Sequence, residues 1–161
     1  MTTNRAQTAF TLIEILIVIG MIAILASIVL VGVNPLRQFA VARNAQRMSD
    51  VNALLNAVGN RMAENEGAFE SDSCPPLPSG ATDMSSASFD IRPCLVPDFM
   101  PELPHDPSNG TNDCTTDSCS GETYDTRYTI SQDATNGRVT VCAPGAAESA
   151  IRASKPYCLT R

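Results

Sequence analysis

One carboxylate, that of Glu14, lies near the start of an otherwise apolar stretch, and no charged residue follows it until Arg37. On insertion scales a carboxylate at the bilayer centre costs roughly 2.5 to 3.5 kcal/mol, although a side chain near a helix end can reach the headgroups. Glu14 is therefore either an acid tolerated at the membrane interface or one that pairs with a cation. An attractive cation is the α-amino group that cleavage just before Phe10 would create. Buried pairs of this kind favour register more than stability.

The uncharged stretch is long enough to cross a membrane. A helix over residues 15–36 would extend about 33 Å at ~1.5 Å per residue, compared with a hydrocarbon core ~30 Å thick. A secretory signal fits poorly, because its apolar core has roughly 7 to 15 residues and ends at a small-residue cleavage site. We therefore expect a membrane helix that either anchors the chain permanently or later packs against copies of itself.

The segment Ala-Phe-Thr-Leu-Ile-Glu-Ile-Leu-Ile-Val-Ile at residues 9–19 closely resembles the cleavage and methylation motif of type IV pilins and type II secretion pseudopilins. The resemblance implies that a prepilin peptidase cuts between Ala9 and Phe10 and N-methylates Phe10. It also implies that Glu14 pairs with the N-terminus of a neighbouring subunit. The family usually has Gly before the cut, so Ala9 is a departure that bears on the rate of processing.

Four segments are expected along the chain: a leader at 1–9, a transmembrane and filament-core helix at 10–33, an amphipathic stem helix at 34–66, and an extracellular globular head at 67–161. Pro35 should interrupt or kink the helix after Asn34, because it removes a backbone donor and crowds the preceding turn. The apolar stripe beyond it, with spacings mostly of three and four, predicts a stem helix to about Glu64 that covers the core of the head. The stripe consists of Leu36, Phe39, Ala40, Met48, Val51, Leu55, Val58 and Met62.

The head is predicted to contain a β-hairpin. Residues 127–131 and 138–142 are β-prone, and the Asn136-Gly137 turn signal lies between them. A hairpin alone is marginal, so it should pack on the stem helix. Residues 74–121 are expected to form a largely irregular loop region. The predicted fold class is α+β, with a long N-terminal helix packed on a small antiparallel sheet, and the resemblance to pilins implies the same arrangement.

All six cysteines lie in the head. An even number confined to one region predicts disulfides and an oxidising exterior, and the paired Cys-x-x-Cys units of zinc sites are absent. Six cysteines allow 15 pairings, which the sequence alone does not decide. We expect the sequential arrangement of Cys74 with Cys94, Cys114 with Cys119, and Cys142 with Cys158.

Two cues for membrane orientation conflict. Arg37, Arg43 and Arg47 follow the span, so the positive-inside rule would place the head in the cytoplasm. The cysteines instead favour an exported head. We expect a single-pass protein with a cytoplasmic N-terminus and an outside head, which joins an extracellular filament after assembly.

A candidate calcium site lies in the loop sequence of the head. Calcium takes six to eight oxygen ligands from flexible loops, but the EF-hand spacing is absent here. Major pseudopilins resemble this chain in having a calcium loop in a comparable region. The alternative is that these residues only solvate a disulfide-tied loop. The candidate ligands are Asp106, Asn109, Asp113, Asp117 and Asp125.

Charge and motifs argue against two classes of function. The net charge is −6, and residues 70–161 carry six basic and thirteen acidic residues, so general nucleic-acid binding is not expected. No phosphate-binding Gly loop, helical His pair or Gly-x-Ser-x-Gly elbow is present in the sequence. We therefore do not expect an enzyme or a cofactor other than calcium.

The sequence is interpreted as a structural subunit of a type IV pilus-like filament. The resemblance implies as partners copies of the chain or related pilins, a prepilin peptidase, and membrane platform and assembly motor proteins. One alternative is a type II secretion pseudopilin, and a DNA-uptake pilus also stays open because these systems differ mainly in partners. Another is a stationary membrane-anchored extracellular binding module, which cleavage before Phe10 would distinguish.

Overall fold

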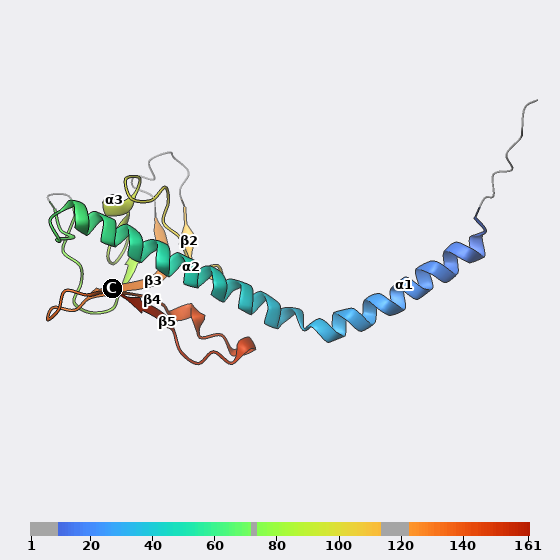
Figure 1. Ribbon diagram of the computed structural model, residues 1–161. Helices are drawn as coiled ribbons and strands as arrows, with labels where there is room; N and C mark the ends of the chain where they lie inside the picture. Colours follow the sequence, from blue (N-terminus) through green and yellow to red (C-terminus); the bar gives the residue numbers. More distant parts are fainter. Residues whose placement is uncertain (1–9, 72–73, 114–122) are drawn as a thin grey trace, which may run out of the picture. The chain divides into compact units, whose positions relative to one another are not determined.

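The structure is a computed structural model that describes residues 10–71, 74–113 and 123–161 (Figure 1). The chain divides into two compact units, Met1–Gln38 and Phe39–Arg161. The first contains helix α1 (Leu12–Val33) and the first turn of helix α2 (Pro35–Glu64). The second contains the rest of α2 and the whole sheet.

Helix α1 is the apolar element of the first unit. Residues Leu12–Val29 have a mean hydropathy of 2.9, so the helix is long and apolar enough to cross a membrane. It ends at Asn34, whose φ of 44° lies in the left-handed region that Asn tolerates better than most residues. The Asn34 Oδ1 also accepts a hydrogen bond from the Arg37 backbone nitrogen at 3.3 Å. Helix α2 then begins at Pro35, and proline is favoured at a first helical position because a backbone N–H there would have no partner within the helix. The predicted interruption after Asn34 is confirmed.

Helix α2 lies along one face of the sheet in the second unit (Figure 1). Its fully buried apolar residues recur at spacings of three and four, which places them on one face of the helix. These residues are Val51, Leu54, Leu55 and Val58. The earlier part of the predicted stripe differs, since Phe39 is 63 % exposed and Met48 is 46 % exposed. Ala40 is the exception in this earlier part, because it is fully buried, so most of the buried stripe belongs to the second half of the helix.

The antiparallel sheet has the strand order β1-β3-β4-β5, and β2 also pairs with β3. The strands are β1 (Thr82–Ser85), β2 (Thr111–Asn112), β3 (Tyr124–Gln132), β4 (Val139–Ala143) and β5 (Tyr157–Thr160). The predicted hairpin is confirmed as β3 and β4, with Ile130 opposite Val141. Strands β1 and β5 were not predicted from the sequence.

Short helices connect the strands. They are α3 (Arg92–Leu95), η1 (Pro144–Ala146) and η2 (Ser149–Ile151). Residues 74–113, which were expected to be largely irregular, therefore hold β1, α3 and β2. Alternate residues of β3 are buried, namely Tyr124, Thr126, Tyr128 and Ile130. Tyr124, Tyr128 and Ile130 belong to the same core cluster as the buried residues of α2. The α+β fold class is confirmed.

Two disulfides hold the described part of the head, and both pairs belong to the sequential arrangement. Cys74–Cys94 is buried and ties the segment after α2 to α3. Cys142–Cys158 joins directly opposed residues of β4 and β5. The expected pair Cys114–Cys119 lies outside the described residues.

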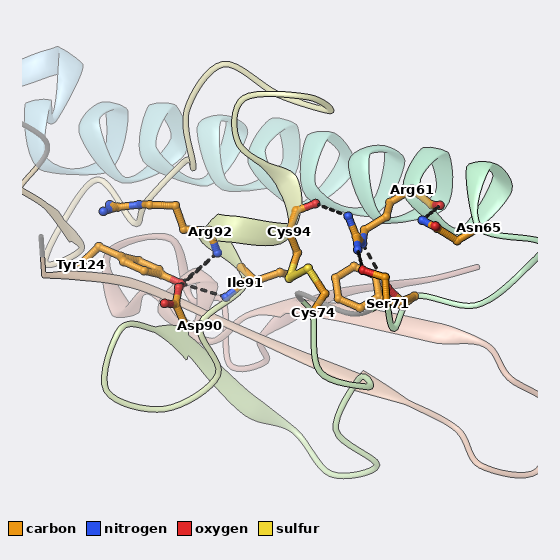
Figure 2. Close-up of a disulfide and its surroundings, with 10 residues drawn as sticks. Arg61, Asn65, Ser71, Cys74, Asp90, Ile91, Arg92, Cys94 and Tyr124 are labelled. Carbon is orange, nitrogen blue, oxygen red and sulfur yellow. Dashed lines mark hydrogen bonds between the residues drawn. A yellow bond between two sulfur atoms is a disulfide. The ribbon is translucent and has the colours of Figure 1, made fainter. Parts of the chain in front are cut away.

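Buried Arg61 joins the end of α2 to this first disulfide (Figure 2). Its guanidinium donates to the carbonyl oxygens of Phe69 and Cys94, each at 3.0 Å, and to Ser71 Oγ at 2.7 Å. The guanidinium carbon also lies 5.3 Å from the centroid of the Phe69 ring. A buried cation that donates from each of its three guanidinium nitrogens holds this loop against the helix.

Candidate functional site

The first turn of α1 has a defined polar cap. Thr11 has an extended backbone, and its Oγ1 accepts a hydrogen bond from the Glu14 backbone nitrogen at 3.3 Å. Thr11 and Glu14 thus have the spacing of a capping box, and an acid in the first helical turn interacts favourably with the helix dipole. Glu14 therefore has a local role at the start of the helix. The sequence analysis missed Thr11, although the Thr-x-x-Glu spacing was a signal for it.

The expected cleavage point lies just before this capped helix. Phe10 is 78 % exposed and precedes the cap, whereas Ala9 lies outside the described residues. Within the first unit, the large apolar side chains of α1 that the structure describes are exposed on every face of the helix. A helix that is apolar all round belongs in a membrane or in a packed core. We therefore expect lipid or other polypeptide chains to cover the apolar side chains of α1.

The structure gives Asp106, one of the candidate calcium ligands, a different partner. The Asp106 carboxylate accepts hydrogen bonds from Arg47 Nε at 2.7 Å and from Arg47 Nη2 at 3.0 Å. Both residues are 1 % exposed. Arg47 also donates to Asn44 and Ser108, each at 2.7 Å, and forms an ion pair with Glu148. A buried charge requires this degree of pairing, because removing it from water is costly.

The pKa values of these groups follow from the pairing. Hydrogen bonding to Asp106 raises the pKa of Arg47 above its ordinary value. Burial alone would raise the pKa of the Asp106 carboxyl, but the hydrogen bonds from Arg47 and the Ser108 backbone outweigh it and hold this pKa below its usual range. Hydrogen bonding to Arg43 lowers the pKa of Glu148. All four side chains are therefore charged near neutral pH.

Gly145 permits the close approach of the C-terminal segment to this ion pair. A Cβ atom at this position would overlap Asp106 Oδ2 and lie 3.2 Å from Arg47 Nη2. The neighbouring Ala146 carbonyl accepts a hydrogen bond from Asn44 Nδ2 at 3.0 Å. Arg47 thus connects α2 with the loop around Asp106 and with the segment that follows β4.

The other candidate calcium ligands occupy separate places. Asn109 is exposed in a turn, and Asp113 is exposed just after β2. Asp125 lies on β3 and forms an ion pair with Arg127 at 3.1 Å. Asp117 lies outside the described residues, and within those residues no group of three or more His, Cys, Asp or Glu side chains could hold a metal. A calcium site stays a prediction, and it would have to do without the Asp106 carboxylate that Arg47 binds.

Removing Arg47 is expected to destabilise the head strongly. Arg47→Met leaves the Asp106 carboxylate buried without a counter-ion, which should lower the free energy of unfolding by about 3 to 5 kcal/mol. The double variant Arg47→Met/Asp106→Leu should recover most of that loss, because neither charge is then buried. Denaturant unfolding of the full chain in detergent, followed by tyrosine circular dichroism, measures both. Equal losses in the single and double variants would contradict this account, and the partly exposed Arg43→Met is the control.

Acid should weaken the same ion pair. Because the pKa of Asp106 is lower in the folded chain than in the unfolded one, its contribution is complete above the ordinary carboxyl range and is lost as pH falls through the folded value. Asp50 opposes this trend, since burial raises its pKa. Between about pH 5 and pH 2, the unfolding free energy of the wild type should fall more steeply than that of Arg47→Met/Asp106→Leu. Parallel pH profiles would exclude this role for Asp106.

Comparison with known proteins places a match at the N-terminus. The family described as the prokaryotic N-terminal methylation motif matches residues 4–30, which include Phe10, Glu14 and most of α1. No curated protein and no solved structure matches the chain. The capped apolar helix and the methylation motif therefore coincide in one segment. The chain carries a prepilin-type N-terminal methylation motif, consistent with the type IV pilin and pseudopilin family.

Proposed function

We propose that this chain is a structural subunit of a type IV pilus-like filament and that it polymerises through α1. The observation that supports this most directly is the methylation motif, which ends within a helix whose apolar side chains are exposed on every face. A subunit with such a helix is stored in the membrane and later packs the same surface against other copies. The motif accordingly suggests a structural, non-enzymatic protein.

The proposed processing follows from the residues at the helix start. A prepilin peptidase cuts between Ala9 and Phe10 and methylates the new amino group of Phe10. This leaves one residue, Phe10, before the Thr11 cap, so the amine lies close to the first turn of α1. In the filament, Glu14 then accepts the amine of a neighbouring subunit. The pair supplies register, because a charge that is left unpaired in an apolar bundle is costly.

Burial of apolar surface does not by itself drive this assembly. Lipid tails are as apolar as the side chains of α1, so transfer from the membrane to a helical bundle gains mainly packing contacts and specific polar pairs. This explains why a single carboxylate in the helix carries so much of the expected specificity. Membrane platform and motor proteins are the proposed partners that supply the work of extraction.

The proposed topology has a cytoplasmic N-terminus, one membrane span and an exported head that becomes part of an extracellular filament. The two disulfides support it, since such bonds persist in oxidising compartments. By the positive-inside rule, Arg37, Arg43 and Arg47 after the span oppose this topology, but less than their number implies. Of the three, Arg43 and Arg47 are bound to carboxylates of the folded head.

The first expected outcome concerns the mature chain. Intact-mass and N-terminal peptide mass spectrometry of protein from its native membrane should show a start at N-methylated Phe10 and oxidised cysteines. A start at Met1 or Thr2 with free thiols would reject the filament proposal and leave a stationary membrane anchor. A pseudopilin would share the processed N-terminus, so recovery of the chain in filaments sheared from the cell surface is the second measurement.

Substitution of Glu14 tests the assembly step itself. Glu14→Ala should reduce the rate and yield of filament formation with wild-type partners, because the neighbouring amine loses its acceptor. Glu14→Asp keeps the charge and is the matched control, and the start residue is read in the same samples to separate processing from assembly. Assembly of Glu14→Ala at the wild-type rate and yield would show that the carboxylate does not set register.

A further inference from the structure

A groove lies between α2 and the C-terminal segment of the head. It has a volume of about 200 Å³ and is lined mainly by apolar side chains. On the α2 side it continues onto the exposed Val41 and Met48, which lie seven residues apart and so share a helix face. The lining residues used here are Met48, Ala146, Ala153, Lys155, Pro156 and Tyr157.

Two cationic residues belong to the segment that lines this groove: Lys155 is part of the lining, and Arg152 directly precedes the lining residue Ala153. Arg152 and Lys155 are exposed, and within the described residues neither has an ion-pair partner. The neighbouring Glu148 does not balance them, because it is bound by Arg43 and Arg47. The backbone nitrogen of Ala153 donates to the Glu148 carbonyl at 3.1 Å, which holds this turn beside α2. We call the groove with Arg152 and Lys155 the basic surface.

The opposite end of α2 carries the opposite charge. Glu64, Glu66, Glu70 and Asp98 are exposed and have no ion-pair partner among the residues described. Asp98 belongs to this group because the next residue, Phe99, packs its ring 5.9 Å from the guanidinium carbon of Arg61. Each guanidinium nitrogen of Arg61 already donates a hydrogen bond to a carbonyl oxygen or to the Ser71 hydroxyl (Figure 2). We call these four carboxylates the acidic surface.

The two surfaces cannot meet within one chain. Met48, which lines the groove together with Lys155, and Glu64 are 16 residues apart on the same helix, a separation of about 24 Å at ~1.5 Å per residue. Complementary surfaces at different places on one molecule make a heterologous contact between copies. Such a contact forms an open helical array when its rotation does not close a ring.

We propose that the basic surface of one copy docks on the acidic surface of another. This contact rests on the proposed function, because it assigns the head a part in the same filament. The half-buried Phe99 and Met100 lie in the segment that carries Asp98, so the partner surface also offers apolar atoms to the groove. Charge complementarity of this kind selects partner and register more than it adds affinity.

A second copy fits the observations better than a membrane surface does. Anionic headgroups would satisfy Arg152 and Lys155, but they would leave the four carboxylates of the acidic surface without a role. In a filament, each copy uses both surfaces at once. The membrane alternative predicts that reversing the charge of the basic surface lowers retention on membranes and leaves filament yield unchanged.

The chain offers a direct crosslinking test, because Lys155 is its only lysine. A zero-length carbodiimide reagent joins a lysine amine to a carboxylate in contact with it. Treatment of native filaments or of wild-type membranes, followed by peptide mass spectrometry, should join Lys155 to Glu64, Glu66, Glu70 or Asp98. The distance along α2 makes any such product intermolecular. Filaments in which Lys155 joins only other carboxylates, or none, would overturn the proposal.

Charge reversal tests the same contact by function. The double variant Arg152→Glu/Lys155→Glu should lower filament yield about tenfold, since two attractive pairs become repulsive. Adding Glu64→Arg/Glu66→Arg to the same chain should restore most of the yield. The matched control is Arg127→Glu/Arg138→Glu, which changes net charge equally, lies in neither surface and, like Arg152, includes a residue of positive φ. Intact disulfides and unchanged denaturant unfolding show that the variants fold.

The outcomes separate this contact from the filament proposal. Normal assembly of both double variants overturns the contact and leaves the filament function standing. Equal defects in the test and control variants also overturn it, because net charge alone then explains the loss. A wild-type chain that starts at Met1 and forms no polymer rejects the proposed function, and the contact fails with it.

Discussion

The head is organised around one buried ion pair. Arg47 projects from α2 into the interior and binds Asp106 from a loop 59 residues further along the chain. Because neither charge is tolerable alone in that place, the loop and the segment after β4 are both required to lie against the helix. On α2 the main cluster of buried apolar residues begins one turn later at Val51, and Ala40 is also buried before Arg47. The earlier part of the helix stays available for other contacts.

The buried polar side chains of this head connect its helices and loops. Arg61 is satisfied by carbonyl oxygens and a hydroxyl, and Arg47 is satisfied mainly by carboxylates. Tyr128 donates to Asp50 at 2.8 Å, and burial raises the pKa of its hydroxyl. Within the described residues, every buried side-chain polar atom has a hydrogen-bond partner. Groups arranged in this way hold loops in place.

Local patterns explain what the sequence predicted well. The β3–β4 hairpin follows from β-prone runs around an Asn-Gly turn, and the break between α1 and α2 follows from Asn34 and Pro35. Both depend on residues that are neighbours along the chain. The two disulfides join cysteines 20 and 16 residues apart, which made the sequential arrangement the simplest one.

Long-range partners explain what the sequence did not predict. Strand β1 has four residues, and it pairs with residues of β3 that lie 40 to 48 positions further along the chain, so no local signal marks it. The carboxylate of Asp106 was grouped with nearby acids because its actual partner, Arg47, is distant in sequence. The spacing of Thr11 and Glu14 is typical of a helix cap, but the resemblance of residues 9–19 to a processing motif predicts a role for Glu14 and none for Thr11.

The Cys142–Cys158 disulfide closes the loop that carries Glu148, Arg152 and Lys155. Oxidation of this pair reduces the number of conformations that the loop can adopt before it packs against α2. A head still in a reducing compartment therefore lacks the restraint that holds its basic groove in shape. In the proposed topology this bond would form only after export, so the basic surface would gain the restraint on the side of the membrane where the proposed filament assembles.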